Sequence, residues 1–136
     1  IWKRGKMEEL YNIGISSNDL ENITYSYPEI RLISNEDIKS KIDFLKRIGC
    51  TDYQVRNIVI SNPWYFRREL TELEKIINTI LSLGISNLSC FINDNPFFLN
   101  KDICEIIDYI NKALRNGQEL KTAVFMLEDN PMLIDK

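Results

Sequence analysis

The sequence predicts an all-α fold: a right-handed superhelical α-solenoid of four repeats, each about 35 residues long. Three observations lead to this prediction. Four of the five glycines recur at intervals of 35, 35 and 33 residues, as Gly14, Gly49, Gly84 and Gly117. All four prolines recur at intervals of 35, 33 and 35 residues, as Pro28, Pro63, Pro96 and Pro131. The residues five positions before and two positions after each proline are apolar, so the period extends into the predicted core.

The length and composition favour one domain over residues 1–136. The chain has 44% apolar and 27% charged residues, which is ordinary for a globular protein. Within the domain the repeat units span about residues 1–35, 36–70, 71–100 and 101–136. A fragment of a longer array of such units would have the same pattern.

Each unit begins with a first helix that ends at the glycine. Apolar residues recur at helical spacing in three of the units, so each unit has one buried helix face. These faces are Ile38, Ile42, Leu45 and Ile48; Leu73, Ile76, Ile77 and Ile80; and Ile103, Ile106, Ile107, Ile110 and Leu114. The glycine stands where the residue after a helix C-terminus needs a positive φ.

A second, shorter helix of about 9–11 residues follows the glycine in each unit. A hydroxyl two residues after the glycine is placed to cap it, at Ser16, Thr51 and Ser86. Thr51 and Gln54 have the spacing of a capping box. Thr71 and Glu74 have the same spacing, at the start of the first helix of unit three. In unit three the interval from glycine to proline is two residues shorter, so the helix near 87–93 is expected to be the shortest of the second helices.

Proline ends the second helix, because it disfavours α geometry in the residue before it. Each unit therefore has two α-helices followed by a short 3₁₀ turn that starts at proline. The bulky residues after proline are expected to fill the joint to the next unit. Such a unit cannot bury its apolar face alone, whereas stacked units bury a continuous core.

Several classes of chemistry have no support in this sequence. Histidine is absent, and the three cysteines follow no C-x-x-C spacing. The acidic residues are scattered, and there is no glycine-rich phosphate loop. We therefore predict a protein that is not an enzyme, with no catalytic residues, no metal, no cofactor and no small-molecule substrate.

The chain is also expected to work away from membranes and in a reducing compartment. No apolar run approaches the roughly 18 residues of a membrane-spanning helix. An odd number of scattered cysteines fits small buried side chains inside a cell.

Charge singles out unit two as the candidate binding region. The whole chain has a net charge of −3, but residues 36–70 contain seven Lys and Arg against five Asp and Glu. The candidate nucleic-acid-binding residues are Lys39, Lys46, Arg47, Arg56, Arg67 and Arg68. Cations on one surface would bind backbone phosphates. The alternative is that they are solvated helix faces and helix-end cations.

Two aromatic residues are candidates for a contact surface. The position immediately after proline is occupied by Glu29, Trp64, Phe97 and Met132, so it lacks the uniform apolar character of a core position. Trp64 and Phe97 are therefore expected to be partly exposed and able to stack on bases.

The order of residues in each unit resembles that of the mitochondrial transcription termination factor (mTERF) family. The likeness is carried by Leu45–Gly49 with Thr51 and Asn62–Phe66, by Leu81–Ile85 with Ser86 and Asn95–Leu99, and more loosely by Leu10–Ile15 with Pro28–Ile30. The resemblance implies stacked units of two α-helices and a 3₁₀ helix. It also implies a non-enzymatic protein that binds double-stranded DNA or RNA.

Two functional hypotheses follow. The first is a nucleic-acid-binding solenoid, and the second is a protein-interaction scaffold that uses the same curved surface. The acidic balance, and the fact that only unit two has more basic than acidic residues, favour the second. The expected location is the cytoplasm of a bacterium, or an organelle if the source is eukaryotic.

Overall fold

Helices form all of the regular structure in the part of the chain that can be described. The computed structural model describes residues 7–85 and 87–130. Within these residues a helix pair followed by a 3₁₀ helix occurs three times, and a further helix pair follows. The prediction of an all-α fold is confirmed. The hand of the superhelix and the number of repeats stay predictions.

The helices end and begin near the periodic glycines and prolines, as predicted. The first helices of the pairs are α1 (Glu8–Asn12), α3 (Asn35–Arg47), α5 (Leu70–Ser82) and α7 (Ile103–Arg115). The second helices are α2 (Ser17–Ser26), α4 (Asp52–Ser61), α6 (Leu88–Asp94) and α8 (Leu120–Asp129). Each of the three 3₁₀ helices begins at a proline: η2 (Pro28–Leu32), η3 (Pro63–Arg67) and η4 (Pro96–Asn100).

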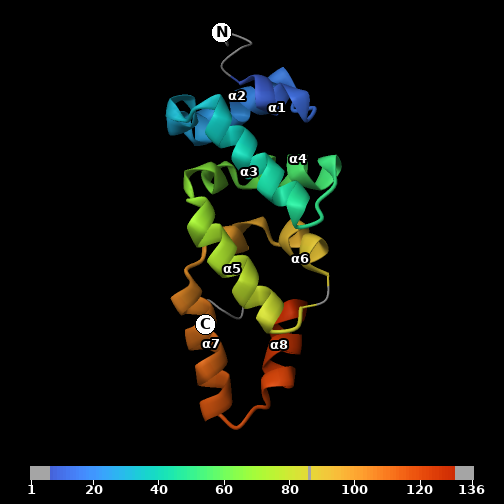
Figure 1. The fold of residues 1–136 in the computed structure, drawn as a ribbon, viewed down its shortest axis with the longest axis vertical. Helices are drawn as coiled ribbons and strands as arrows, with labels where there is room; N and C mark the ends of the chain where they lie inside the picture. The colour runs from blue at the N-terminus through green and yellow to red at the C-terminus, as the bar shows by residue number, and fades with distance from the viewer. Residues whose placement is uncertain (1–6, 86, 131–136) are drawn as a thin grey trace.

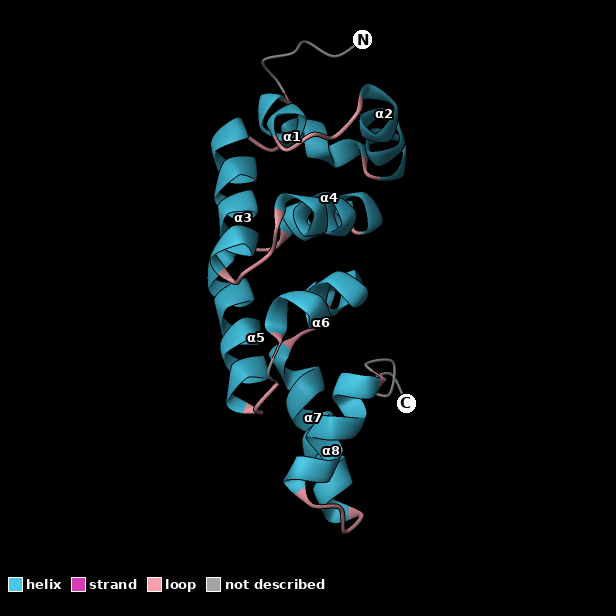
Figure 2. Cartoon of the chain, turned by 90° about the vertical axis from the view of Figure 1, so that its right-hand side faces the viewer, coloured by secondary structure: helices cyan, strands magenta, loops and turns pink. Residues whose placement is uncertain are grey.

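The helix pairs are stacked along the long axis of the molecule, with α1 and α2 at one end and α7 and α8 at the other (Figure 1). Helices α3 and α5 line one side of the stack, and the second helices α4 and α6 lie on the other (Figure 2). No helix in the described residues is long and apolar enough to cross a membrane.

Glycine makes the turn inside each helix pair. Gly49 has φ +106°, and its amide donates to the carbonyl of Lys46 while the next amide, of Cys50, donates to that of Leu45. This is the Schellman pattern, which satisfies carbonyls that a helix end leaves without partners. Positive φ at the three equivalent glycines, 14, 84 and 117, confirms the predicted turns.

The predicted caps are confirmed in units one and two. The Ser16 hydroxyl accepts from the amide of Asp19 at 3.1 Å. Thr51 and Gln54 form the complete capping box, with bonds of 2.9 and 3.2 Å.

Two predicted caps differ from the structure. The N-cap of α6 is Asn87, whose side chain accepts from the amide of Cys90, and Ser86 lies outside the described residues. Helix α5 already begins at Leu70, so Thr71 lies inside it and the prediction of a Thr71 cap is wrong. The backbone of Glu69 is extended, and its carbonyl accepts the first helical bond from Leu73, which starts the helix before Thr71 is reached.

The core consists of the predicted apolar positions. Leu45, Leu73 and Ile76 are almost completely buried, as are Ile30, Tyr65 and Phe98 two residues after the prolines. Helix α6 has 7 residues, whereas α2, α4 and α8 have 10 each, as the shortened interval in unit three predicts.

The predicted buried face of α7 is only partly correct. Ile106 and Ile110 are buried, but Ile107 is 45% and Leu114 is 43% exposed. The buried face continues through Ala113 instead. Ile107 and Leu114 are seven residues apart and therefore share a helix face, and no other described element covers this face.

Two asparagine side chains, one of them fully buried, connect units two and three. The Asn62 side chain is fully buried, and it donates to the carbonyl of Pro96 and to the side chain of Asn100. Asn100 donates back to Asn62 at 3.0 Å. These bonds satisfy polar groups that would otherwise be costly to bury, and they fix the position of η4 against η3.

We predict that Gly49→Val destabilises the protein by about 1–3 kcal/mol, because a β-branched residue resists positive φ. An added Cβ would only touch Ser89 at 3.7 Å, so backbone strain causes most of the loss. Urea unfolding measures the change. Gly49→Asn is expected to lose less, since asparagine tolerates positive φ. Equal stability of Gly49→Val and the unmodified chain would contradict the turn assignment.

A leucine pair tests the stacked core. Leu45 is fully buried on α3, whereas Leu81 is 51% exposed on α5. Leu45→Ala is expected to cost about 2–5 kcal/mol and Leu81→Ala less than about 1 kcal/mol. Thermal and urea unfolding compare the two variants. A similar loss for both would contradict the burial assigned to Leu45.

Candidate nucleic-acid interface

The six candidate basic residues of unit two have different surroundings. Arg56, on α4, lies across the turn of the first helix pair. Its guanidinium donates to the carbonyl of Ile13 at 2.9 Å, and its atoms lie 3.2–3.7 Å from where a Cβ on Gly14 would stand. The side chain is half-buried and joins units one and two.

Arg68 makes the corresponding kind of connection farther along the chain. Its side chain is only 14% exposed and lies between Glu72 and Asp102, at 3.6 Å from each carboxylate. It also donates to the main-chain carbonyl of Lys101 at 3.1 Å. Glu72 lies in the first turn of α5, whereas Lys101 and Asp102 immediately precede α7, so the protein itself holds Arg68 between units two and three.

Lys46 and Arg47 lie near the end of α3 and form exposed ion pairs. Lys46 is 3.2 Å from Asp52, and Arg47 is 3.0 Å from Glu74. The Arg47 guanidinium also lies 5.1 Å from the centre of the Phe44 ring. The four charged side chains of these pairs are 43–65% exposed, so solvent competes for each of them.

Lys39 and Arg67 are exposed, and neither forms a salt bridge within residues 7–85 and 87–130. They face different directions. Arg67 lines a cavity together with Lys41, whereas Lys39 is two residues from Lys41 on α3 and therefore points about 200° away from it. Lys39 and Lys46, seven residues apart, share the opposite face of that helix.

The structure thus separates the six candidates into three groups. Lys39, Lys46 and Arg47 lie on the exposed side of α3, Arg67 lies beside the cavity, and Arg56 and Arg68 connect units. Sequence spacing could place cations on a helix face, but it could not show which side chains bond to carbonyls 33 or 43 residues away.

Trp64 and Phe97 belong to a row of aromatic rings. The Trp64 ring lies 6.3 Å from that of Tyr27 on one side and 6.3 Å from that of Phe97 on the other. Trp64 is half-buried and Phe97 is 53% exposed, as expected for the position after proline. Sequence analysis missed Tyr27, because it precedes its proline whereas the other two follow theirs.

Arg67 influences the electrostatics at the first ring of this row. Burial raises the pKa of the Tyr27 hydroxyl; the Arg67 cation opposes the rise and the Glu29 carboxylate adds to it. Elsewhere, burial raises the pKa of the Cys50 thiol to about 11, with a smaller contribution from Cys90, so Cys50 is a poor nucleophile. No cluster of three or more potential metal ligands occurs in the described part of the chain.

Comparison with known proteins gives one family. The sequence model of the mTERF family matches residues 3–92 of this chain. No curated protein matches the chain. The matched region covers the first two units and most of the third, including all six candidate basic residues and the Trp64 ring.

We predict that Arg56 and Arg67 differ in their effect on stability. Arg56→Met leaves the Ile13 carbonyl without its side-chain donor, which is expected to cost about 1–3 kcal/mol. Arg67→Met removes an exposed cation and is expected to change stability by less than about 0.5 kcal/mol. Urea unfolding of the two variants checks this. A stable Arg56→Met variant would show that Arg56 is not needed to join the units.

Proposed function

The chain belongs to the mTERF family, and from this premise we propose that it is a non-enzymatic helical-repeat protein that binds nucleic acid. The proposal rests on family membership together with one local observation. Three cations lie exposed along about two turns of α3, in the only unit where Lys and Arg outnumber Asp and Glu.

These three residues, Lys39, Lys46 and Arg47, are named the α3 basic patch. The ion pairs of Lys46 and Arg47 do not remove them from consideration. Exposed ion pairs contribute only about 0.2–1 kcal/mol, so a polyanion can displace Asp52 or Glu74 at small cost. Asp43 lies among them and lowers the local potential, which favours modest affinity.

Arg67 with Trp64 and Phe97 forms a second contact surface in this proposal. A cation near the Tyr27 end of a partly exposed aromatic row suits a single strand, whose bases can stack on a ring while its phosphates meet the guanidinium. The rings already touch one another, so a base would stack on the exposed Phe97 and would not enter between rings. Arg56 and Arg68 are assigned to holding the units together.

A protein-interaction scaffold is the second candidate function. The observation that favours it is a group of large apolar side chains exposed by 39–69% in units three and four: Leu81, Ile107, Leu114, Leu120, Phe125 and Met126. The net charge of −3 also weakens the attraction of the whole chain for a polyanion.

The finer features of the fold and the location of the protein are part of this proposal. We take the four helix pairs as four repeats of a right-handed superhelix over residues 1–136. The protein is placed in a reducing compartment, which is the cytoplasm in a bacterium or an organelle in a eukaryote.

The first experiment measures binding to random-sequence duplex DNA, single-stranded DNA and RNA across a salt series. If the α3 basic patch meets three phosphates, the slope of log K against log salt for duplex DNA is expected to be roughly −2.7. The triple variant Lys39→Gln, Lys46→Gln, Arg47→Gln is expected to lose most of this slope. Arg67→Gln is expected to weaken single-strand binding more than duplex binding.

A control variant removes the same charge elsewhere. Lys75→Gln, Arg115→Gln and Lys121→Gln together change three exposed cations of units three and four. If this variant loses as much affinity as the patch variant, binding depends on net charge, and the assignment of the α3 basic patch as the binding surface is wrong. An absence of binding at low salt would contradict the nucleic-acid proposal and favour the scaffold.

A further inference from the structure

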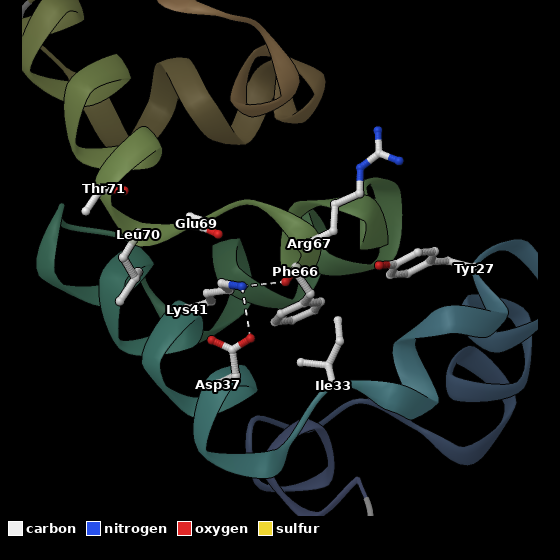
Figure 3. A pocket seen from close by; sticks show the side chains of 9 residues that line it. All are labelled: Tyr27, Ile33, Asp37, Lys41, Phe66, Arg67, Glu69, Leu70 and Thr71. Carbon is white, nitrogen blue, oxygen red and sulfur yellow. Dashed lines mark hydrogen bonds and ion pairs between the residues drawn. The ribbon is translucent and has the colours of Figure 1, made fainter.

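A cavity of about 520 Å³ lies at the joint between units one and two. Its walls come from the end of unit one, from α3, and from the segment that joins η3 to α5 (Figure 3). Apolar side chains form part of the lining, and the charged lining residues are Asp37, Lys41, Arg67 and Glu69. The next joint along the chain gives a direct comparison, because the same positions recur one unit later.

In that next joint an arginine occupies the equivalent space. Arg68 stands five residues after Pro63, and its guanidinium lies between Glu72 and Asp102 and donates to the Lys101 carbonyl. The residue five positions after Pro28 is Ile33, which carries no charge. The partners of Arg68 have counterparts: Asp37 corresponds to Glu72, Glu69 to Asp102, and the carbonyl of Arg68 itself to that of Lys101.

Lys41 is the residue that partly replaces the positive charge that Arg68 supplies in the next joint. Its buried ammonium donates to Asp37 at 3.2 Å and to the carbonyl of Phe66 at 2.6 Å. Glu69, in contrast, has no ion pair within the described residues. Arg67 also lines the cavity, but Figure 3 shows its side chain extending away from Lys41 and Glu69. On the side of the cavity away from the Arg67 side chain, two partly exposed carboxylates, Asp37 and Glu69, therefore face one buried cation, Lys41.

We infer that this cavity is a binding site for the guanidinium group of an arginine side chain from a partner polypeptide. The guanidinium would lie as Arg68 lies one joint later, with Glu69 and the free oxygen of Asp37 as acceptors. Ile33 and Leu70, which are half-buried, provide apolar surface for the methylene stem. A planar guanidinium bonds two carboxylates better than an ammonium does, so the site favours arginine over lysine.

The test uses a tripeptide probe and the isotope-labelled whole chain. Acetyl-Gly-Arg-Gly-amide is titrated while the amide resonances of residues 66–71 are followed by NMR. The matched control is the same peptide with citrulline, which has the length of arginine but no charge. A third peptide has lysine in place of arginine and tests the preference for a guanidinium. We expect the arginine peptide to shift these resonances until the site is saturated, and the citrulline and lysine peptides to bind at least about threefold more weakly.

Two variants locate the site. Glu69→Gln is expected to weaken binding of the arginine peptide by about threefold to fivefold. The control is Glu36→Gln, which changes an exposed carboxylate outside the cavity and is expected to leave binding unchanged. Ile33→Arg supplies the missing arginine from within and is expected to abolish binding. If Ile33→Arg does not fold, Glu69→Gln still decides the matter.

The inference is overturned if the arginine and citrulline peptides bind equally, if lysine binds as well as arginine, or if Glu69→Gln has no effect. The site does not depend on nucleic-acid binding. Loss of duplex binding in the α3 basic patch variant, with the peptide titration unchanged, would separate the two.

Discussion

A glycine with positive φ inside each helix pair is the constraint on which the rest of this structure depends. At Gly49 the chain leaves α3, satisfies two of its terminal carbonyls and begins α4 at Asp52. A side chain at this position would meet backbone strain, while the space around it is ordinary. The direction of α4, and with it the position of η3, follows from this one turn.

Polar bonds between units determine the use of the basic residues. Stacked units bury main-chain carbonyls and amide side chains at each joint, and these groups need donors. Arg56 donates to the carbonyl of Ile13, and Arg68 donates to that of Lys101. Asn62 donates to the carbonyl of Pro96 and to the side chain of Asn100. Two of the six candidate cations of unit two, Arg56 and Arg68, therefore stabilise the stack. The positive charge left exposed to a phosphate is smaller than the composition of the unit indicates.

Repetition with small changes gives each joint its own chemistry. Arg68 fills the joint between units two and three, whereas Ile33 and Lys41 leave a cavity between units one and two. At the other end of the stack Ile107 and Leu114 stay exposed because no further described unit covers them. A solenoid can thus present a polar cavity, a basic helix face and an apolar end on one scaffold.

The period of glycine and proline determined the helix pairs, the 3₁₀ helices and most of the core, because these features depend on residue type at fixed spacing. The spacing did not determine that α5 begins at Leu70, that Tyr27 joins the aromatic row, or that Arg67 and Lys39 face different directions. The start of α5 depends on the local backbone of Glu69, whereas the aromatic row and the cavity beside Arg67 depend on contacts between units one and two. Only the stacked structure decides which carbonyl each long, flexible cation reaches.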